Sequence, residues 1–515
     1  MVNAVGRTIP DSIPGYKKIV PYAGPFATIP HGRRAGPVLK SYSPGRNKVL
    51  SSIEEAIEAS GLKDGMTISF HHALRNGDRV MNLVMSIISK MGIKNLTLAP
   101  TSFLDTNDDL IPYFESGVVT AAQTSGVRGR LGEYLTNTRL PGMTIIRPHG
   151  GRARAITSGE LHVDVSFLAA PACDRLGNIN GVQGPAACGS MGYAMVDARY
   201  ADTVIAITDN LTENALYPIS IPQHFIDWIV KVDSIGDPRG ISSGALRITS
   251  DPRDLLLAKS TARVIEHAGW YKDNYTLQLG AGAASVAAGL FLRDIMLRDK
   301  ITAGFAIGGI PGPFCDLLDE GLIRVMYDTQ SFDLRAITSI RDNPRHIEYD
   351  SDHYANPWNK GAMVNYLDYV VLGATEVDIN FNVNVITDSK GQIMGALGGH
   401  PDTSAGAKCT IIVTPLLRGR LPIINDAVQT ISTPGETVDV VITERGIAVN
   451  PRRQDIKDNL TEAGIPLMDI QQLRDIAYKT TGIPDPVRVT DEVTAVVEYR
   501  DGTVLDVVRK PLEES

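Results

Sequence analysis

One long pattern of residues occurs twice in this chain, about half a chain apart. In each copy, an apolar run leads into a set of polar residues, a glycine-rich segment follows, and a second apolar run closes the pattern. The polar residues that recur, each time 204 residues apart, are Asp174 and Asp378, Asn178 and Asn382, and Asn180 and Asn384. A period of this length is far beyond that of a solenoid repeat, so the chain is predicted to contain two homologous domains.

Each half also carries the pattern of a parallel α/β unit, in which an apolar segment, a loop, an amphipathic helix and another apolar segment follow in order. These segments are 66–70, 80–91 and 95–99 in the first half, and 275–279, 284–297 and 303–307 in the second. The predicted fold class is therefore α/β, with two homologous domains that each form a mainly parallel sheet flanked by helices.

The predicted boundaries follow changes in composition. Residues 1–45 contain seven prolines, so they are expected to form an extended arm that packs over another part of the protein, for which a second subunit is one candidate. The polar, turn-rich segment 233–250 separates a first domain, 46–240, from a second domain, 241–515. Two β-rich runs flank Asp501-Gly502, which predicts a hairpin at the end of the second domain.

The composition excludes several classes of protein. Among the 515 residues, 43% are apolar and the net charge is −8, which gives no basic surface for nucleic acid. No apolar run approaches the ~20 residues that span a bilayer, and no signal peptide is seen at the start, so a cytoplasmic protein is expected. The four cysteines show no CxxC spacing, which favours isolated buried thiols over a zinc site.

Positively charged or titratable side chains follow two predicted strands of the first half. The first group is His71, His72 and Arg75, and the second is Arg147, His149, Arg152 and Arg154. Because the carboxyl ends of parallel strands meet at one edge of a sheet, the two groups together suit a ligand with several carboxylates. The alternatives are a solvated basic loop and a hydrogen-bonded structural histidine.

Glycine-rich loops follow strands of the second half. The run Gly280–Ser285 is similar to a dinucleotide loop, but its sixth residue is serine and Asp294 follows too soon to bind a ribose. The loops containing Gly308-Gly309 and Gly398-Gly399 are better suited to present backbone N–H groups to an oxyanion. Asp328 ends the predicted strand 323–327, where an acid either is catalytic or caps a turn.

Longer stretches resemble a known family. The segment GGIPGPFCDLLDEGLIRVMYD, from Gly308, resembles the part of CoA-transferases that leads to their active-site glutamate. The stretches SFHHALRNGD, RPHGGRARA and LGNINGVQGPAACGSMGYAMVDARYAD are similar, more narrowly, to the citrate lyase alpha-subunit family, the citrate CoA-transferase component of that enzyme. The resemblance extends over essentially the whole chain.

This resemblance implies a reaction in which acetyl-acyl carrier protein and citrate give citryl-acyl carrier protein and acetate. It implies as partners citrate, the acyl carrier protein (gamma) subunit, the citryl lyase (beta) subunit and further copies of this chain. No cofactor is expected to bind directly, because the CoA-like phosphopantetheine-type group is carried on the acyl carrier protein, with CoA or acetyl-CoA as a surrogate. Asp328 replaces the transferase glutamate, and its shorter side chain favours an orienting role over nucleophilic attack.

Two other functions remain open at this point. One is a CoA-transferase or thioesterase that acts on free acyl-CoA and a monocarboxylate, although a monocarboxylate needs only one cation. The other is a scaffold subunit without catalytic activity, although the glycine loops that catalysis requires are present.

Overall fold

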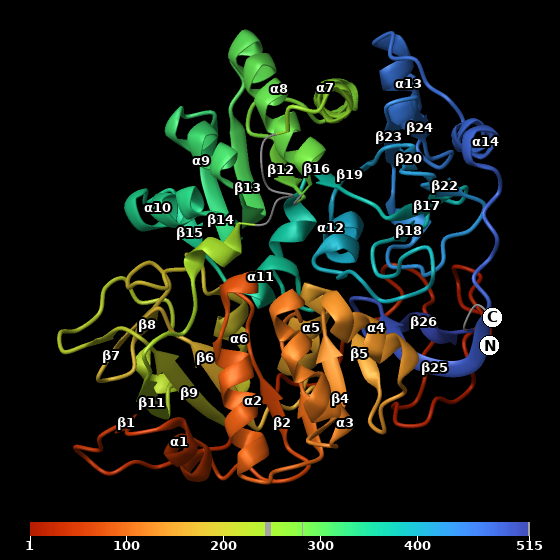
Figure 1. Cartoon of the computed structure of the whole chain (residues 1–515). Coiled ribbons are helices and arrows are strands. Elements are labelled where there is room, and N and C mark those ends of the chain that lie inside the picture. Colours follow the sequence, from red (N-terminus) through yellow and green to blue (C-terminus); the bar gives the residue numbers. More distant parts are fainter. Residues whose placement is uncertain (243–248, 281, 513–515) are drawn as a thin grey trace.

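Two large, mainly parallel sheets make up the core of the protein, one for each half of the chain (Figure 1). The computed structural model describes residues 1–242, 249–280 and 282–512. The first sheet has ten strands, in the order β1 (Val49–Leu50), β11 (Trp228–Lys231), β9 (Thr203–Thr208), β6 (Val165–Ala169), β2 (Thr67–Ser69), β3 (Leu96–Leu98), β4 (Val119–Thr124), β5 (Thr144–Ile146), β25 (Val489–Glu498) and β26 (Val504–Pro511). The second has eight, in the order β15 (His346–Glu348), β14 (Ile323–Ser331), β13 (Ala303–Ile310), β12 (Thr276–Leu279), β16 (Tyr369–Leu372), β19 (Cys409–Val413), β23 (Val440–Thr443) and β24 (Gly446–Val449).

Helices flank both sheets. Those of the first half are α1 (Ile53–Ser60), α2 (Val80–Lys90), α3 (Ile111–Glu115), α4 (Gly129–Asn137), α5 (His149–Thr157) and α6 (Gly192–Tyr200). Those of the second half are α7 (Pro252–His267), α8 (Ala283–Asp299), α9 (Gly312–Asp319), α10 (Leu334–Asp342), α11 (Ser351–Ala355), α12 (His400–Gly406), α13 (Gln454–Glu462) and α14 (Ile470–Thr481). In each sheet only the last pair of strands is antiparallel, which confirms the predicted fold class. Within the described ranges, every helix is too short or too polar to span a bilayer.

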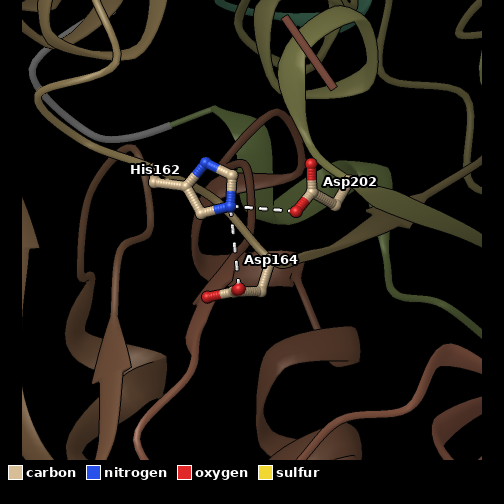
Figure 2. A group of neighbouring side chains, drawn as sticks. All are labelled: His162, Asp164 and Asp202. Atoms are coloured by element: carbon tan, nitrogen blue, oxygen red, sulfur yellow. Dashed lines mark hydrogen bonds and ion pairs between the residues drawn. The ribbon is translucent and has the colours of Figure 1, made fainter. Parts of the chain in front are cut away.

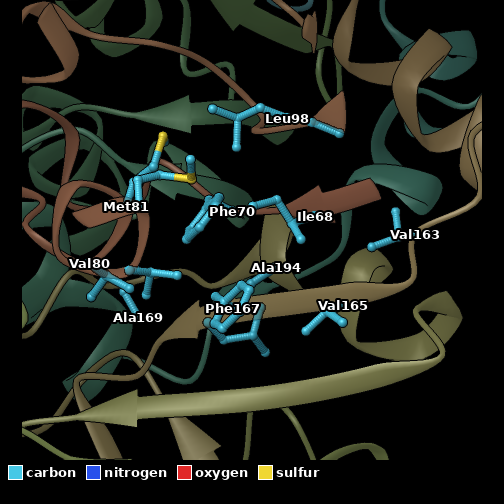
Figure 3. Close-up of a cluster of buried hydrophobic side chains, with 14 of the residues drawn as sticks. Ile68, Phe70, Val80, Met81, Leu98, Val163, Val165, Phe167, Ala169 and Ala194 are labelled. Atoms are coloured by element: carbon cyan, nitrogen blue, oxygen red, sulfur yellow. The ribbon is translucent and has the colours of Figure 1, made fainter. Parts of the chain in front are cut away.

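The core beneath α2 shows how the apolar pattern sets this arrangement (Figure 3). Val80 and Met81 on α2 are buried in one cluster with Phe70 and Phe167, whose rings stack with centroids 5.4 Å apart. The helix is followed by Gly92, which adopts the left-handed conformation that ends a helix readily. Strand β2, helix α2 and strand β3 thus form a parallel unit, and the loop after β2 emerges at the carboxyl edge of the sheet.

Two small sheets carry the repeated polar residues. They are β10 (Leu211–Thr212), β7 (Ala172–Asp174) and β8 (Ile179–Asn180) in the first half, and β18 (Val383–Asn384), β17 (Glu376–Asp378) and β22 (Ile424–Asn425) in the second. In the first, Asp174 Oδ1 accepts the backbone N–H of Asn178, and Asn178 Nδ2 donates to Asp174 Oδ2. Asp378 and Asn382 make the same pair of contacts. The repeated residues therefore close the same turn in both halves.

The carboxyl-terminal hairpin belongs to the first sheet, whereas the sequence places it in the second domain. Strand β25 pairs in parallel with β5, and β26 then pairs with β25 as the edge of the ten-stranded sheet. Alternation of apolar residues identifies these strands, but it does not identify their partner, because pairing between segments ~350 residues apart leaves no local signal. The chain thus returns to its first domain at the end.

The proline-rich arm packs against its own chain. Asn3 Nδ2 donates to the carbonyl of Leu505, and the N–H of Tyr22 donates to the carbonyl of Val504, both in the hairpin. Farther along, Arg34 forms an ion pair with Asp352 of the second half. The arm has the predicted extended form and joins the hairpin to both halves.

The two halves hold each other through reciprocal loops. From the first half, the Ser190 hydroxyl donates to the carbonyl of Asp328, and the Met191 N–H donates to Glu348. From the second half, Leu397 N–H donates to the carbonyl of Ser125, and the carbonyl of Gly398 accepts the N–H of His149. The loops at the strand ends of each domain therefore meet the other domain.

Candidate active site

A cavity of about 550 Å³ lies between the two halves, where these loops meet. The first half contributes loops that follow β2, β3, β4 and β5. The second contributes the end of β13 and loops that follow β12, β14, β16 and β18. Its polar lining side chains are those of His72, Arg75, Ser102, Ser125, Arg128, His149, Tyr193, Gln278, Gln330, Tyr354, Thr375, His400 and Arg418. Ligand sites in open α/β sheets form at such strand ends, so this cavity is the candidate active site.

Positive charge in this cavity is not matched by negative charge. Arg75 is half-buried and Arg128 lies exposed beside it, while the described lining residues include no aspartate or glutamate. Among the described residues, no carboxylate lies within 4.0 Å of either guanidinium. Burial first, and then the nearby charge of Arg128, lower the pKa of Arg75 to about 10. Two adjacent cations, of which Arg75 is partly desolvated, have no acid partner among the described residues, and they form a site for an anion with more than one charge.

A stack of three rings forms one wall of the cavity. The Tyr193 ring lies 4.3 Å from the His149 ring and 5.0 Å from the His72 ring, measured between centroids. Burial lowers the pKa of His149 to about 3, and the charge of Arg152 acts in the same direction. His149 is therefore neutral near pH 7, and its buried Nδ1 has no hydrogen-bond partner among the described residues.

Three of the four glycines predicted as oxyanion donors line the cavity: Gly309, Gly398 and Gly399. Gly398 has a φ of +54°, and neither its N–H nor that of Gly399 donates to an acceptor within the described part of the chain. A Cβ at position 399 would lie 2.4 Å from the Tyr354 hydroxyl oxygen, so only glycine fits there. These two N–H groups are thus free to bind an oxyanion. Gly308 is not among the lining residues, and Ala281 of the predicted glycine loop lies outside the described residues.

Three predicted substrate-binding arginines instead hold the fold together. Arg152 donates to both carboxylate oxygens of Asp197, over 2.7 and 2.9 Å. Arg147 forms an ion pair with Glu498 of the hairpin, and Arg154 donates to Glu160. All three arginines are nearly fully buried, so each of their charges requires a partner of opposite charge. Arg147 precedes helix α5, and Arg152 and Arg154 lie on it. None of the three lines the cavity, because their guanidinium groups pair with these acids. This corrects the expectation that they face the substrate.

Two further predicted residues are also enclosed. His71 shares a hydrogen bond of 3.1 Å with the carbonyl of Ala169, and burial lowers its pKa to about 4. Asp328 is fully buried, and its Oδ2 accepts a hydrogen bond from Ser331 and lies 3.2 Å from His346 Nε2. Strand β14 continues to Ser331, so Asp328 lies inside the strand and not at its end. Neither residue lines the cavity, whereas Arg75 and His149 do.

Several lining residues were not predicted from the sequence. Arg128 lies in the cationic segment 127–155, so its charge was a usable signal, but it precedes a helix and does not follow the apolar run directly. Tyr193 and Gln330 gave no signal, because an isolated tyrosine or glutamine is common in any domain. Gln330 Nε2 donates to the carbonyl of His72 and so connects the two halves at the cavity.

A separate polar group lies away from this cavity. His162 Nε2 is 2.9 Å from Asp202 Oδ2 and 3.7 Å from Asp164 Oδ1 (Figure 2). The two carboxylates also accept backbone N–H groups, from Thr67 and from Val38 of the arm. The three side chains have the ligand atoms of a cation site, but these hydrogen bonds account for their arrangement as a structural connection.

Comparison with known proteins identifies close relatives. The family model described as citrate lyase, alpha subunit (CitF), matches residues 46–511. The citrate lyase alpha chain of Klebsiella pneumoniae is 49% identical over 493 residues, which cover 96% of each chain. That of Escherichia coli K12 is 49% identical over 90% of this chain and 91% of its own.

Solved structures agree with this match. A structure described as the alpha subunit of citrate lyase from Streptococcus mutans, in complex with citrate, superposes with a TM-score of 0.96 at 46% identity and covers 99% of this chain and 100% of its own. A malonate decarboxylase alpha subunit from Acinetobacter baumannii shares the fold, with a TM-score of 0.61 at 15% identity over 85% of this chain and 94% of its own.

Proposed function

We propose, since the chain belongs to the citrate lyase alpha-subunit family, that it transfers an acyl-carrier thioester from acetyl to citrate. The products are citryl-acyl carrier protein and acetate, and the citryl product is the substrate for subsequent cleavage to oxaloacetate. The observation that carries this proposal is the pair Arg75 and Arg128, which faces a cavity whose described lining residues include no carboxylate. Citrate would supply the missing negative charges.

The first chemical step is an attack by citrate. One carboxylate oxygen of citrate attacks the carbonyl carbon of the acetyl thioester, and the carrier leaves as a thiolate. The product is a mixed anhydride of citrate and acetate. Arg75 and Arg128 bind the carboxylates that do not react, which orients the third toward the thioester.

In the second step, the carrier thiolate forms a thioester with the citryl group. The thiolate attacks the citryl carbonyl carbon of the anhydride, and acetate leaves with the bridging oxygen. Both steps place negative charge on a carbonyl oxygen, which the N–H groups of Gly398 and Gly399 can bind, and one such donor is typically worth ~3 kcal/mol. The enclosed position between two domains limits hydrolysis of the anhydride.

The residues that line the cavity favour citrate as the nucleophile. An enzyme carboxylate would have to reach the thioester carbonyl, but no acid lines the cavity within the described ranges, and Asp328 is fully buried outside it. We therefore assign Asp328 a structural role beside Ser331 and His346. His149, which is neutral, is placed to donate or accept a hydrogen bond within the same cavity.

The proposed reaction also requires an acyl carrier protein and further subunits. The acyl group arrives on a CoA-like phosphopantetheine-type group of an acyl carrier protein, the gamma subunit, and acetyl-CoA serves as a surrogate. A citryl lyase beta subunit consumes the product, and several copies of this chain assemble with both. A transferase for monocarboxylates is less compatible with this cavity, because acetate or butyrate would neutralise only one of two adjacent cations that have no acid partner in the described part of the chain.

The test is an assay of the isolated chain with acetyl-CoA and either citrate or butyrate. Release of acetate and formation of citryl-CoA with citrate alone would support the proposal. Equal activity with butyrate, or citrate turnover that is unchanged in both Arg75→Ala and Arg128→Ala, would contradict it.

A further inference from the structure

We infer that Phe332 is a positioning residue that holds Arg75 in the cavity without neutralising its charge. The guanidinium carbon of Arg75 lies 5.4 Å from the centroid of the Phe332 ring, and both residues line the cavity. Arg75 comes from the first half of the chain and Phe332 from the second, so the contact forms only when the two domains meet. The inference rests on the proposed function, in which Arg75 binds a citrate carboxylate.

The place of the Phe332 ring is determined by Gly309. A Cβ at position 309 would lie 2.0 Å from Cζ of Phe332 and within 2.6 Å of two further ring atoms. The pairing of β13 with β14 also shifts register between Gly308 and Gly309, which brings the end of β13 close to the residues that follow β14. The ring therefore occupies space that any side chain at position 309 would take.

The backbone of Arg75 is held at the same strand end. Arg75 has a φ of +52°, a left-handed conformation that is costly for a residue with a Cβ and requires support from its surroundings. That support comes from Gln330, whose Nε2 donates over 2.9 Å to the carbonyl of His72, which in turn accepts the N–H of Arg75. Gln330 on β14 thus supports the backbone of the loop that contains Arg75, and Phe332, directly after β14, supports the Arg75 side chain.

An aromatic partner of an arginine, unlike an acidic one, does not neutralise its charge. The electron-rich face of the ring attracts a guanidinium, but it leaves the net positive charge in place. Arg152 shows the alternative, because Asp197 fixes it with two hydrogen bonds and also neutralises it. A carboxylate beside Arg75 would compete with citrate, whereas the ring orients the cation and leaves its donors available.

The test replaces the ring and measures citrate binding. Phe332→Leu and Phe332→Met remove the aromatic face, while Phe332→Tyr and Phe332→Trp retain it. We expect the citrate KM of the first two variants to rise about 2- to 30-fold, the range of a cation–π contact, with little change in kcat. The variants with an aromatic ring should stay close to the wild type. Phe305→Leu, in β13 outside the cavity, is the matched control and should leave the citrate KM unchanged.

A double-mutant cycle decides whether Phe332 acts through Arg75. If it does, Phe332→Leu should raise the citrate KM in the wild type but cause little further rise in Arg75→Ala. Calorimetric titration of citrate without an acyl donor should show the same coupling. The same factor in both backgrounds, or an unchanged KM in both non-aromatic variants, would overturn the inference. Failure of the wild-type chain to bind citrate would instead refute the proposed function, so the two failures are distinguishable.

Discussion

The structure predicts that Arg152→Ala destabilises the protein and does not directly weaken citrate binding. The Arg152 guanidinium makes two hydrogen bonds to Asp197, of 2.7 and 2.9 Å, and a third of 2.7 Å to the carbonyl of Ala99. Asp197 is fully buried, so loss of the arginine leaves its charge without a partner. Removal of one partner of a buried ion pair typically costs ~3–5 kcal/mol.

Urea denaturation followed by circular dichroism measures this effect. The midpoint of the first unfolding transition should fall in Arg152→Ala. Arg75→Ala, which loses no ion pair to any described residue, should unfold close to the wild type. The double variant Arg152→Met/Asp197→Leu should recover much of the loss, because it removes both charges together. A wild-type midpoint for Arg152→Ala, combined with a tenfold rise in the citrate KM, would show that this arginine reaches the substrate.

Three further predictions concern the cavity and its border. Arg75→Ala and Arg128→Ala should each raise the citrate KM about 10- to 100-fold, as expected for a lost charged hydrogen bond, with unchanged melting temperatures; a KM within twofold of the wild type in both would argue against these cations. Burial raises the pKa of Asp402 to about 7, above its unfolded value of ~4, so its stabilising contribution is present below pH ~4 and is lost as the pH rises through about 7. Asp402→Asn should therefore show a weaker fall in unfolding free energy over that interval, and an unchanged pH profile would count against it. The peptide that contains Asp328 should carry no covalent adduct after incubation with acetyl-CoA alone, and a CoA-sized mass on it would identify Asp328 as a nucleophile.

The sequence predicts the fold more fully than it predicts the site. Apolar runs, glycines and the internal repeat report local geometry, and from them follow the two parallel sheets and the loops that meet at their carboxyl ends. These signals also indicate Arg75, His149, Gly309, Gly398 and Gly399, because each of these residues follows directly on a strand or lies in a glycine-rich loop.

The sequence does not predict contacts between side chains that are far apart along the chain. A row of arginines shows that charge is present, but not which acids neutralise it. Glu498, which pairs with Arg147, is 351 residues away and arrives on a hairpin that joins the first sheet. The position of Asp328 depends on where β14 ends, and apolar periodicity places such an end only within a few residues.

An oxygen-isotope experiment can determine whether citrate itself attacks the thioester. The wild-type chain is mixed with acetyl-CoA and citrate labelled with ¹⁸O in its carboxylates, and acetate from a single turnover is analysed by mass spectrometry. Because the bridging oxygen of the anhydride comes from citrate and leaves with acetate, each acetate should carry one ¹⁸O atom. Unlabelled acetate in the first turnover would contradict the account, since its new oxygen would then come from the enzyme or from water.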